Sequence, residues 1–231
     1  MVLFSQHPFL SLFLDPTCKH LLDLIDDPNI EMKLPKEEFC ETSRLATIRS
    51  LGLQTKMNRY TFIHVIKQLP HQQLQLERSH KLWEYLQQEW NHFQSSNDLS
   101  QDKFETALYT LVWLPVMPKP KDYKLPWFDS EKVLTSAQLS RPKKDKDLVS
   151  SVMPIADVRF HDSHRNIFLR MFGWDLPPKP IHALSHLQKI SSHYDSEMEE
   201  QVQSIAHKVY EILDKSDNWD TKMFRQYKII C

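Results

Sequence analysis

The chain has 231 residues, of which 41% are hydrophobic and 26% are charged, and it contains only 2 glycines. Because glycine lets a backbone loop close tightly around a phosphate, this shortage excludes the common glycine-rich nucleotide-binding loops. The 29 basic and 30 acidic side chains give a net charge of -1, so no general electrostatic attraction draws the chain to nucleic acid or to an anionic membrane.

The first 111 residues carry hydrophobic side chains at helical spacing, interrupted by residues that cap or stop helices. Gly52 follows the first pattern and is predicted at the C′ position, in the left-handed conformation. Asn58 is the predicted N-cap of the next helix, which Pro70 ends. We therefore expect helices over 36–51, 58–70, 72–94 and 102–111.

Residues 112–157 differ in character, because six of the 14 prolines lie there. Proline fixes φ and has no backbone donor, so long helices are not expected in this stretch. Short strands over 112–116, 132–135 and 148–155, joined by loops, fit the pattern better. The charged stretch 143–147 is predicted to be a solvent-exposed loop.

Helical patterns return after residue 160. A helix is expected over 164–172, with Asp162 or Ser163 as its N-cap and Gly173 at its C′ position. Another helix is expected over 181–190. The inward-facing residues of the first of these helices are predicted to be Ile167, Phe168 and Met171.

The last helical pattern repeats over two heptads, with apolar residues at Met198, Val202, Ile205, Val209 and Ile212. Two heptads are short for a coiled coil with a partner chain, so we expect this stripe to pack within the chain. A final short helix is predicted from residue 217.

These patterns predict an α+β fold that is mainly helical, with a small proline-rich β segment between two helical parts. The predicted organisation is an N-terminal helical part over 1–111, a proline-rich β segment over 112–160 and a C-terminal helical part over 161–231. The three parts are expected to form one or two packed lobes of a single region.

Twelve histidines make a metal site worth testing, and His161 and His164 have a suitable spacing, as do His182, His186 and His193. Neither group includes the glutamate of a zinc-protease helix, and no third ligand is singled out. No nucleophile elbow is present either. We therefore predict no enzyme activity and no catalytic, cofactor-binding or metal-binding residue, and we expect no cofactor.

The three cysteines are widely spaced and form no C-x-x-C pair, which is typical of a protein in a reducing compartment. No apolar run reaches 18 residues, the length needed to span a bilayer. We expect a cytoplasmic protein with protein partners and no membrane partner.

Three stretches, in this order, resemble the large repeats of the sacsin family. The first is FCETSRLATIRSLGL over 39–53, preceded by LDP over 14–16. The second is WLPVMP over 113–118, followed by LPW over 125–127 and KDLVSSVMP over 146–154. The third is FGWDLPP over 172–178, followed by the helix that ends LQKI at 187–190. The resemblance covers about residues 14–190.

Sacsin is a giant cytosolic co-chaperone scaffold, and each of its repeats joins a GHKL-type ATPase module to a region like this one. The resemblance implies the ATPase-free part of such a repeat, because this chain has no glycine-rich ATP lid, no His-Pro-Asp tripeptide and no ubiquitin-like segment. The implied role is chaperone-related protein binding, including binding to heat-shock chaperones. The alternatives are a metal-dependent hydrolase centred on His161 and His164, and a helical adaptor unrelated to sacsin.

Overall fold

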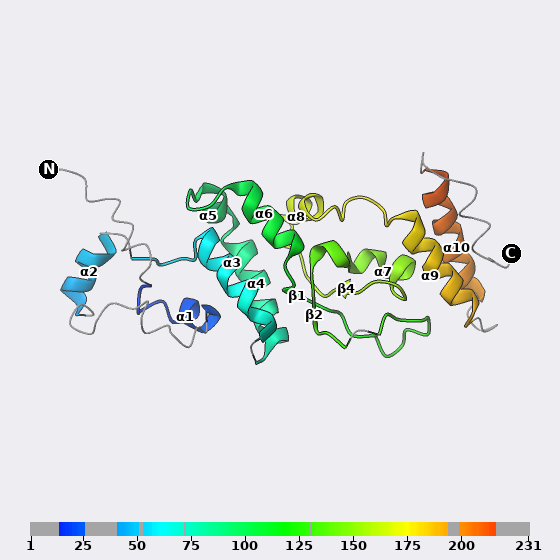
Figure 1. Ribbon diagram of the computed structural model, residues 1–231, viewed down its shortest axis with the longest axis horizontal. Coiled ribbons are helices and arrows are strands. Elements are labelled where there is room, and N and C mark those ends of the chain that lie inside the picture. The colour runs from blue at the N-terminus through cyan, green and yellow to red at the C-terminus, as the bar shows by residue number, and fades with distance from the viewer. Residues whose placement is uncertain are drawn as a thin grey trace.

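The computed structural model describes residues 14–25, 41–50, 53–71, 73–129, 131–193 and 199–215. Helices dominate, with two small sheets between them (Figure 1), which confirms the predicted mainly helical α+β fold. In Figure 1, α2 (Thr42–Ser50) lies at one end of the long axis. The pair formed by α9 (Pro180–Ser191) and α10 (Glu199–Asp214) lies at the other end, and the strands lie between.

The N-terminal part is helical as predicted. The Asn58 side chain caps α3 (Arg59–Gln68) by accepting a 2.8 Å hydrogen bond from the backbone N–H of Thr61, so this predicted N-cap is confirmed. The remaining helices of this part are α1 (Lys19–Ile25), α3 (Arg59–Gln68), the 3-10 turn η4 (Leu69–His71), α4 (Gln75–Gln88), α5 (Trp90–Ser95) and α6 (Gln101–Thr110).

The helix predicted over 72–94 is wrong as a single element, because the chain forms two helices that meet at Glu89. Glu89 has φ −99° and ψ 14°, outside the helical range, and its carboxylate pairs with Lys56 at 2.6 Å. The bend allows apolar side chains of both helices to face one core. Hydrophobic spacing continues across it, which is why the sequence pattern did not reveal the break.

The proline-rich segment holds four two-residue strands. β1 (Leu114–Pro115) pairs antiparallel with β2 (Leu134–Thr135), and β3 (Arg141–Pro142) pairs parallel with β4 (Ile155–Ala156). An antiparallel bridge between Val116 and Ala156 joins the two sheets. The two sheets are therefore connected to each other between the two helical parts. Their strands are shorter than predicted.

Two predictions in this segment are wrong. Residues 143–147 are not an exposed loop, because they form the 3-10 turn η6 (Lys143–Asp145) and the start of α7 (Lys146–Val149). The strand predicted over 148–155 begins only at Ile155. The buried Asp145 carboxylate pairs with Arg141 four residues earlier, and this contact holds the charged stretch against the protein in a helical turn.

Gly173 follows α8 (Arg165–Met171) and has φ +62°, so the predicted left-handed C′ glycine is confirmed. Its N–H bonds to the carbonyl of Arg170, and the Trp174 N–H bonds to the carbonyl of Leu169, as in a Schellman motif. The predicted N-cap is wrong, because a turn over 161–164 precedes the helix and its N-cap is His164. Ile167 is exposed rather than inward.

The larger hydrophobic core is aromatic and draws residues from all three predicted parts of the chain. Trp83 and Phe168 have ring centroids 5.1 Å apart, and those of Trp90 and Phe168 are 4.8 Å apart. The chief aromatic members are Phe62, Trp83, Trp90, Phe93, Phe104, Trp113, Phe168, Phe172 and Trp174.

Arg59 is buried at the start of α3, and its guanidinium ties the end of α5 to the loop after it. It donates to the carbonyl oxygens of Phe93, Gln94 and Leu99 and lies over the Phe104 ring at 5.8 Å. The last carbonyl groups of a helix lack a full set of intrahelical donors, so a buried arginine helps to satisfy the C-terminus of α5 here.

A smaller, mostly aliphatic core joins α9 and α10 to α7. Ile205 and Val209 of the predicted heptad stripe are buried there, so the prediction that α10 packs within the chain is confirmed. The other members are Tyr123, Leu125, Ala183, Leu184, Leu187, Ile190 and Leu213. The predictions for Gly52, Met198 and a helix from residue 217 lie outside the described residues.

Candidate functional site

Two neighbouring hollows lie along the proline-rich segment. The larger has a volume of about 1070 Å³ and reaches from Tyr109 to His182, while the smaller has about 410 Å³ and lies beside Leu76. Phe128, Asp129 and Lys132 line both. Because they share these residues, we describe the two hollows together as the groove.

Exposed apolar side chains gather on the groove. Five of the nine large hydrophobic residues that are exposed in the described part of the chain line it. These five are Leu76, Val112, Val133, Leu139 and Leu176. Single exposed apolar residues are normal on a protein surface, but a contiguous group around a hollow is typical of a binding site.

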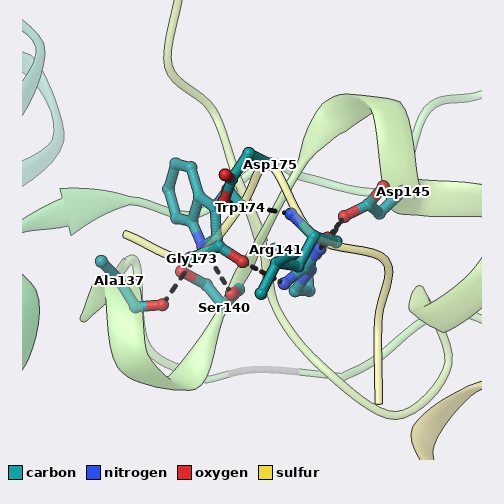
Figure 2. Close-up of polar contacts among 8 residues, drawn as sticks. Ala137, Ser140, Arg141, Asp145, Gly173, Trp174 and Asp175 are labelled. Atoms are coloured by element: carbon teal, nitrogen blue, oxygen red, sulfur yellow. Dashed lines mark hydrogen bonds and ion pairs between the residues drawn. The ribbon is translucent and has the colours of Figure 1, made fainter. Parts of the chain in front are cut away.

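Trp174 forms part of the floor of the larger hollow. The Schellman turn at Gly173 directs the chain back, and the buried indole N–H then donates to the carbonyl oxygens of Ser140 at 3.1 Å and Ala137 at 3.3 Å. Figure 2 shows the indole beside these two residues. The tryptophan therefore ties the end of α8 to the turn before β3, and this wall of the groove is preorganised.

Arg141 supports the same wall from the other side. Its guanidinium donates to the carbonyl oxygens of Gly173 and Leu176 and forms a two-point contact with the Asp145 carboxylate, at 2.6 and 2.8 Å (Figure 2). Burial raises the pKa of Asp145, and the charge of Arg141 acts in the opposite direction. Since both charges are satisfied internally, this pair holds the site together and leaves little charge for a ligand.

Lys179 and His182, at and near the N-terminus of α9, line the larger hollow. Lys179 is the N-cap and its side chain makes no cap hydrogen bond, and no acidic residue lies in the first turn. Burial lowers the pKa of His182, with further lowering from the charges of Lys179 and Arg141, so the neutral form of its imidazole is favoured. The helix end adds partial positive charge.

Ser136 lies in the wall of the larger hollow and is 1% exposed. Its hydroxyl has no hydrogen-bond partner among the described residues, although most buried polar atoms in proteins are paired. The hydroxyl oxygen is itself buried, so it lies behind the groove surface.

The histidines considered for a metal site do not come together. His161 contacts the Glu84 carboxylate through Nε2 at 2.8 Å, and the His164 ring contacts the adjacent Ser163 hydroxyl. Across the described ranges, no group of three or more His, Cys, Asp or Glu residues is placed to hold a metal ion.

His186 is fully buried and has a structural environment. Its Nδ1 accepts from the Ser151 backbone N–H at 3.2 Å and lies 2.7 Å from the Ser151 hydroxyl, so Nε2 carries the proton and donates to the Asp147 carbonyl at 3.1 Å. Burial lowers its pKa to about 4. The ring therefore links α9 to the end of α7.

The sequence did not identify the groove. Its lining residues span positions 76–182 and share no spacing, because the two sheets and the turn at Gly173 bring them together. A signal for part of it was present in the FGW stretch at 172–174, where a left-handed glycine directly precedes a tryptophan.

No protein-family model matches this chain, and neither a curated protein nor a solved structure matches it. The resemblance to sacsin repeats therefore stays a prediction. Within the residues that the structure describes, no helix is both long and apolar enough to cross a bilayer.

Proposed function

We propose that this chain is a protein-interaction module that binds an extended segment of a partner protein in the groove. The observation that carries the proposal is the gathering of exposed apolar side chains on the two joined hollows. Burying such side chains against a partner releases water from apolar surface, which is the main driving force of association.

The size of the groove favours a peptide over a small molecule. Pockets for small ligands have volumes of roughly 300–1000 Å³ and enclose most of the ligand. The larger hollow alone has about 1070 Å³, and Leu139 and Leu176 on its lining are 60% and 64% exposed. A long site with exposed apolar side chains suits a segment of chain whose own side chains enter successive hollows.

A chaperone-related role follows from the same chemistry. Unfolded clients and flexible chaperone tails offer extended apolar segments, and a preformed groove binds such segments without rearranging its own walls. The implied role is that of the ATPase-free lobe of a sacsin-type co-chaperone scaffold in the cytoplasm, acting without catalysis.

The test uses a neutral probe: an eight-residue peptide with blocked ends, labelled with an uncharged BODIPY dye, in which leucines alternate with glutamines. Fluorescence anisotropy should show saturable binding to the full chain. The double variant Leu139→Ser/Leu176→Ser should bind about thirtyfold more weakly, because each substitution removes about 1 kcal/mol of apolar contact.

The matched control is Tyr60→Ser/Ile167→Ser, which removes two other exposed apolar side chains that do not line the groove. This variant should bind the probe within about twofold of the unmodified chain, since neither residue would touch it. Equal loss in both double variants, or no saturable binding by the unmodified chain, would rule out the groove as the binding site.

A further inference from the structure

We infer that the segment bound in the groove joins the small sheets as an added β-strand, pairing with the free edge of β2. This inference rests on the proposed function and specifies how the backbone of the partner is recognised. It follows from the hydrogen-bonding groups that the strands leave unused, because strand addition draws its affinity from main-chain hydrogen bonds.

β2 lies at one end of the row of strands. β1 pairs with β2 on one side, and on its other side β1 meets β4 through the bridge between Val116 and Ala156. β4 pairs in turn with β3, so the order across the two sheets is β2, β1, β4, β3. β2 therefore has one edge that no strand of the described ranges covers.

The hydrogen bonds of β2 show which of its groups face the free edge. The carbonyl oxygen of Val133 accepts from the Val116 N–H at 2.9 Å, and that of Thr135 accepts from the Trp113 N–H at 3.0 Å. Neighbouring residues of a strand direct their backbone groups to opposite edges. The N–H and C=O of Leu134, which lies between Val133 and Thr135, therefore point away from β1.

The backbone groups of Leu134 are unpaired. Neither forms a hydrogen bond with any residue that the structure describes, although Leu134 is only 4% exposed. A backbone group that is shielded from water without a partner is costly, so a bound segment that supplies the missing acceptor and donor is favoured. The edge of β3 offers less, because Pro142 has no N–H to donate there.

The groove runs along the free edge of β2. Lys132 and Val133 line the smaller hollow, and Lys132, Leu134 and Thr135 line the larger one. The chain of β2 therefore passes from one hollow to the other. A segment paired with it would lie in both hollows, where its side chains contact exposed apolar residues such as Val133 and Leu139.

The experiment uses two N-methylated versions of the neutral probe. One carries N-methyl groups on its two central leucines and the other on its two central glutamines, so both lose two backbone donors. In an extended segment, the N–H groups of the leucines and of the glutamines point to opposite edges. We expect one version to bind about thirtyfold more weakly than the neutral probe, because it cannot pair with β2, and the other to bind within about threefold of it.

NMR spectroscopy of the isotope-labelled full chain locates the contact. Binding of the neutral probe should move the Leu134 amide proton signal downfield, since this N–H gains an acceptor. The internal control is the Trp113 N–H, which already donates to the Thr135 carbonyl and should keep its position. Saturating amounts of the weaker N-methylated version should leave the Leu134 signal where it is in the free chain.

The outcomes separate this inference from the proposed function. If the neutral probe binds in the groove and both N-methylated versions bind equally well or equally poorly, the backbone does not pair with β2. The inference is then overturned and the proposed function stands. A Leu134 signal that does not move when the neutral probe binds also overturns the inference. If no probe binds saturably, the proposed function fails and this inference fails with it.

Discussion

The two hydrophobic cores are built from different chemistry. The larger core packs aromatic rings edge to face, as between Phe62 and Trp113, whose centroids lie 5.9 Å apart at 86°. The smaller core is mostly aliphatic, and polar contacts of His186 and Tyr123 connect its helices to the end of α7. The stability of the larger core therefore depends on how well its rings fit together. The stability of the smaller core also depends on the protonation state of His186.

This difference predicts two kinds of sensitivity. Loss of volume should be most damaging in the aromatic core, because interlocked rings cannot collapse into a cavity without losing several contacts at once. A fall in pH should destabilise the smaller core most, because the hydrogen bonds that connect it to α7 include those of His186, which must stay neutral. The groove lies where elements of both regions meet, so both kinds of damage can reach it.

The largest effect is expected for Trp113→Ala in the aromatic core. Trp113 is fully buried, packs against Phe62 and Trp83, and donates from its indole to the Leu108 carbonyl at 2.9 Å. Its removal should lower the free energy of unfolding by about 4 kcal/mol. Urea denaturation followed by circular dichroism measures this loss.

The companion substitution is Leu184→Ala in the smaller core, which should cost about 3 kcal/mol. Hydrogen exchange then separates the cores: Trp113→Ala should speed exchange in α3–α6, whereas Leu184→Ala should speed it in α9 and α10 alone. If both variants speed exchange everywhere, the two cores unfold as one cooperative unit and the comparison between them is wrong.

The second effect is an acid-dependent loss of stability in the smaller core. His186 has a folded-state pKa of about 4 against 6.5 in a flexible chain, so the unfolded chain binds the extra proton between these values. Stability from this group is therefore complete above about pH 6.5 and is lost as the pH falls toward 4. The loss should be at most about 3 kcal/mol.

The measurement is urea denaturation between pH 4 and 7, compared with His186→Gln, which has no proton to gain at this position. The variant should be less stable at pH 7 and should have a shallower pH dependence. His182 contributes a slope of the same sign in both proteins, because its pKa is also lowered. Asp15, whose pKa is lowered to about 2 mainly by Arg49, acts only below this range. Parallel pH profiles would show that His186 does not control the acid response.

Local signals in the sequence were sufficient for much of the fold. Asn58 as an N-cap, Gly173 as a C′ residue and the inward stripe of α10 were predicted correctly, because each depends on residues within one or two turns. The helix over 143–149 was missed because a buried ion pair stabilises it. The charged residues of that stretch, directly after Pro142, indicate a loop when the ion pair between Arg141 and Asp145 is not known to be buried.

The site depended on contacts that no local pattern contains. Arg141 reaches the carbonyl oxygens of Gly173 and Leu176, more than 30 residues away, and Trp174 reaches back to Ser140. His186 was considered as a metal ligand on spacing alone, whereas its partners come from α7 and from the turn that follows it. Spacing identifies which residues share a helix face, but it does not say what packs against that face.

The smallest effect is expected at Gly173, between α8 and Trp174. A Cβ built there would meet no atom within 4 Å, so space is not limiting and only the φ of +62° opposes a side chain. Gly173→Val should therefore cost about 1–2 kcal/mol, from backbone strain and the stiffness of a β-branched residue in the left-handed region. Gly173→Asn should cost less than half as much, since asparagine tolerates this region. A thermal melt of both variants gives the comparison. Equal losses for the two would mean that backbone conformation is not what requires glycine, and a loss above about 3 kcal/mol would mean that the turn holding Trp174 had collapsed with it.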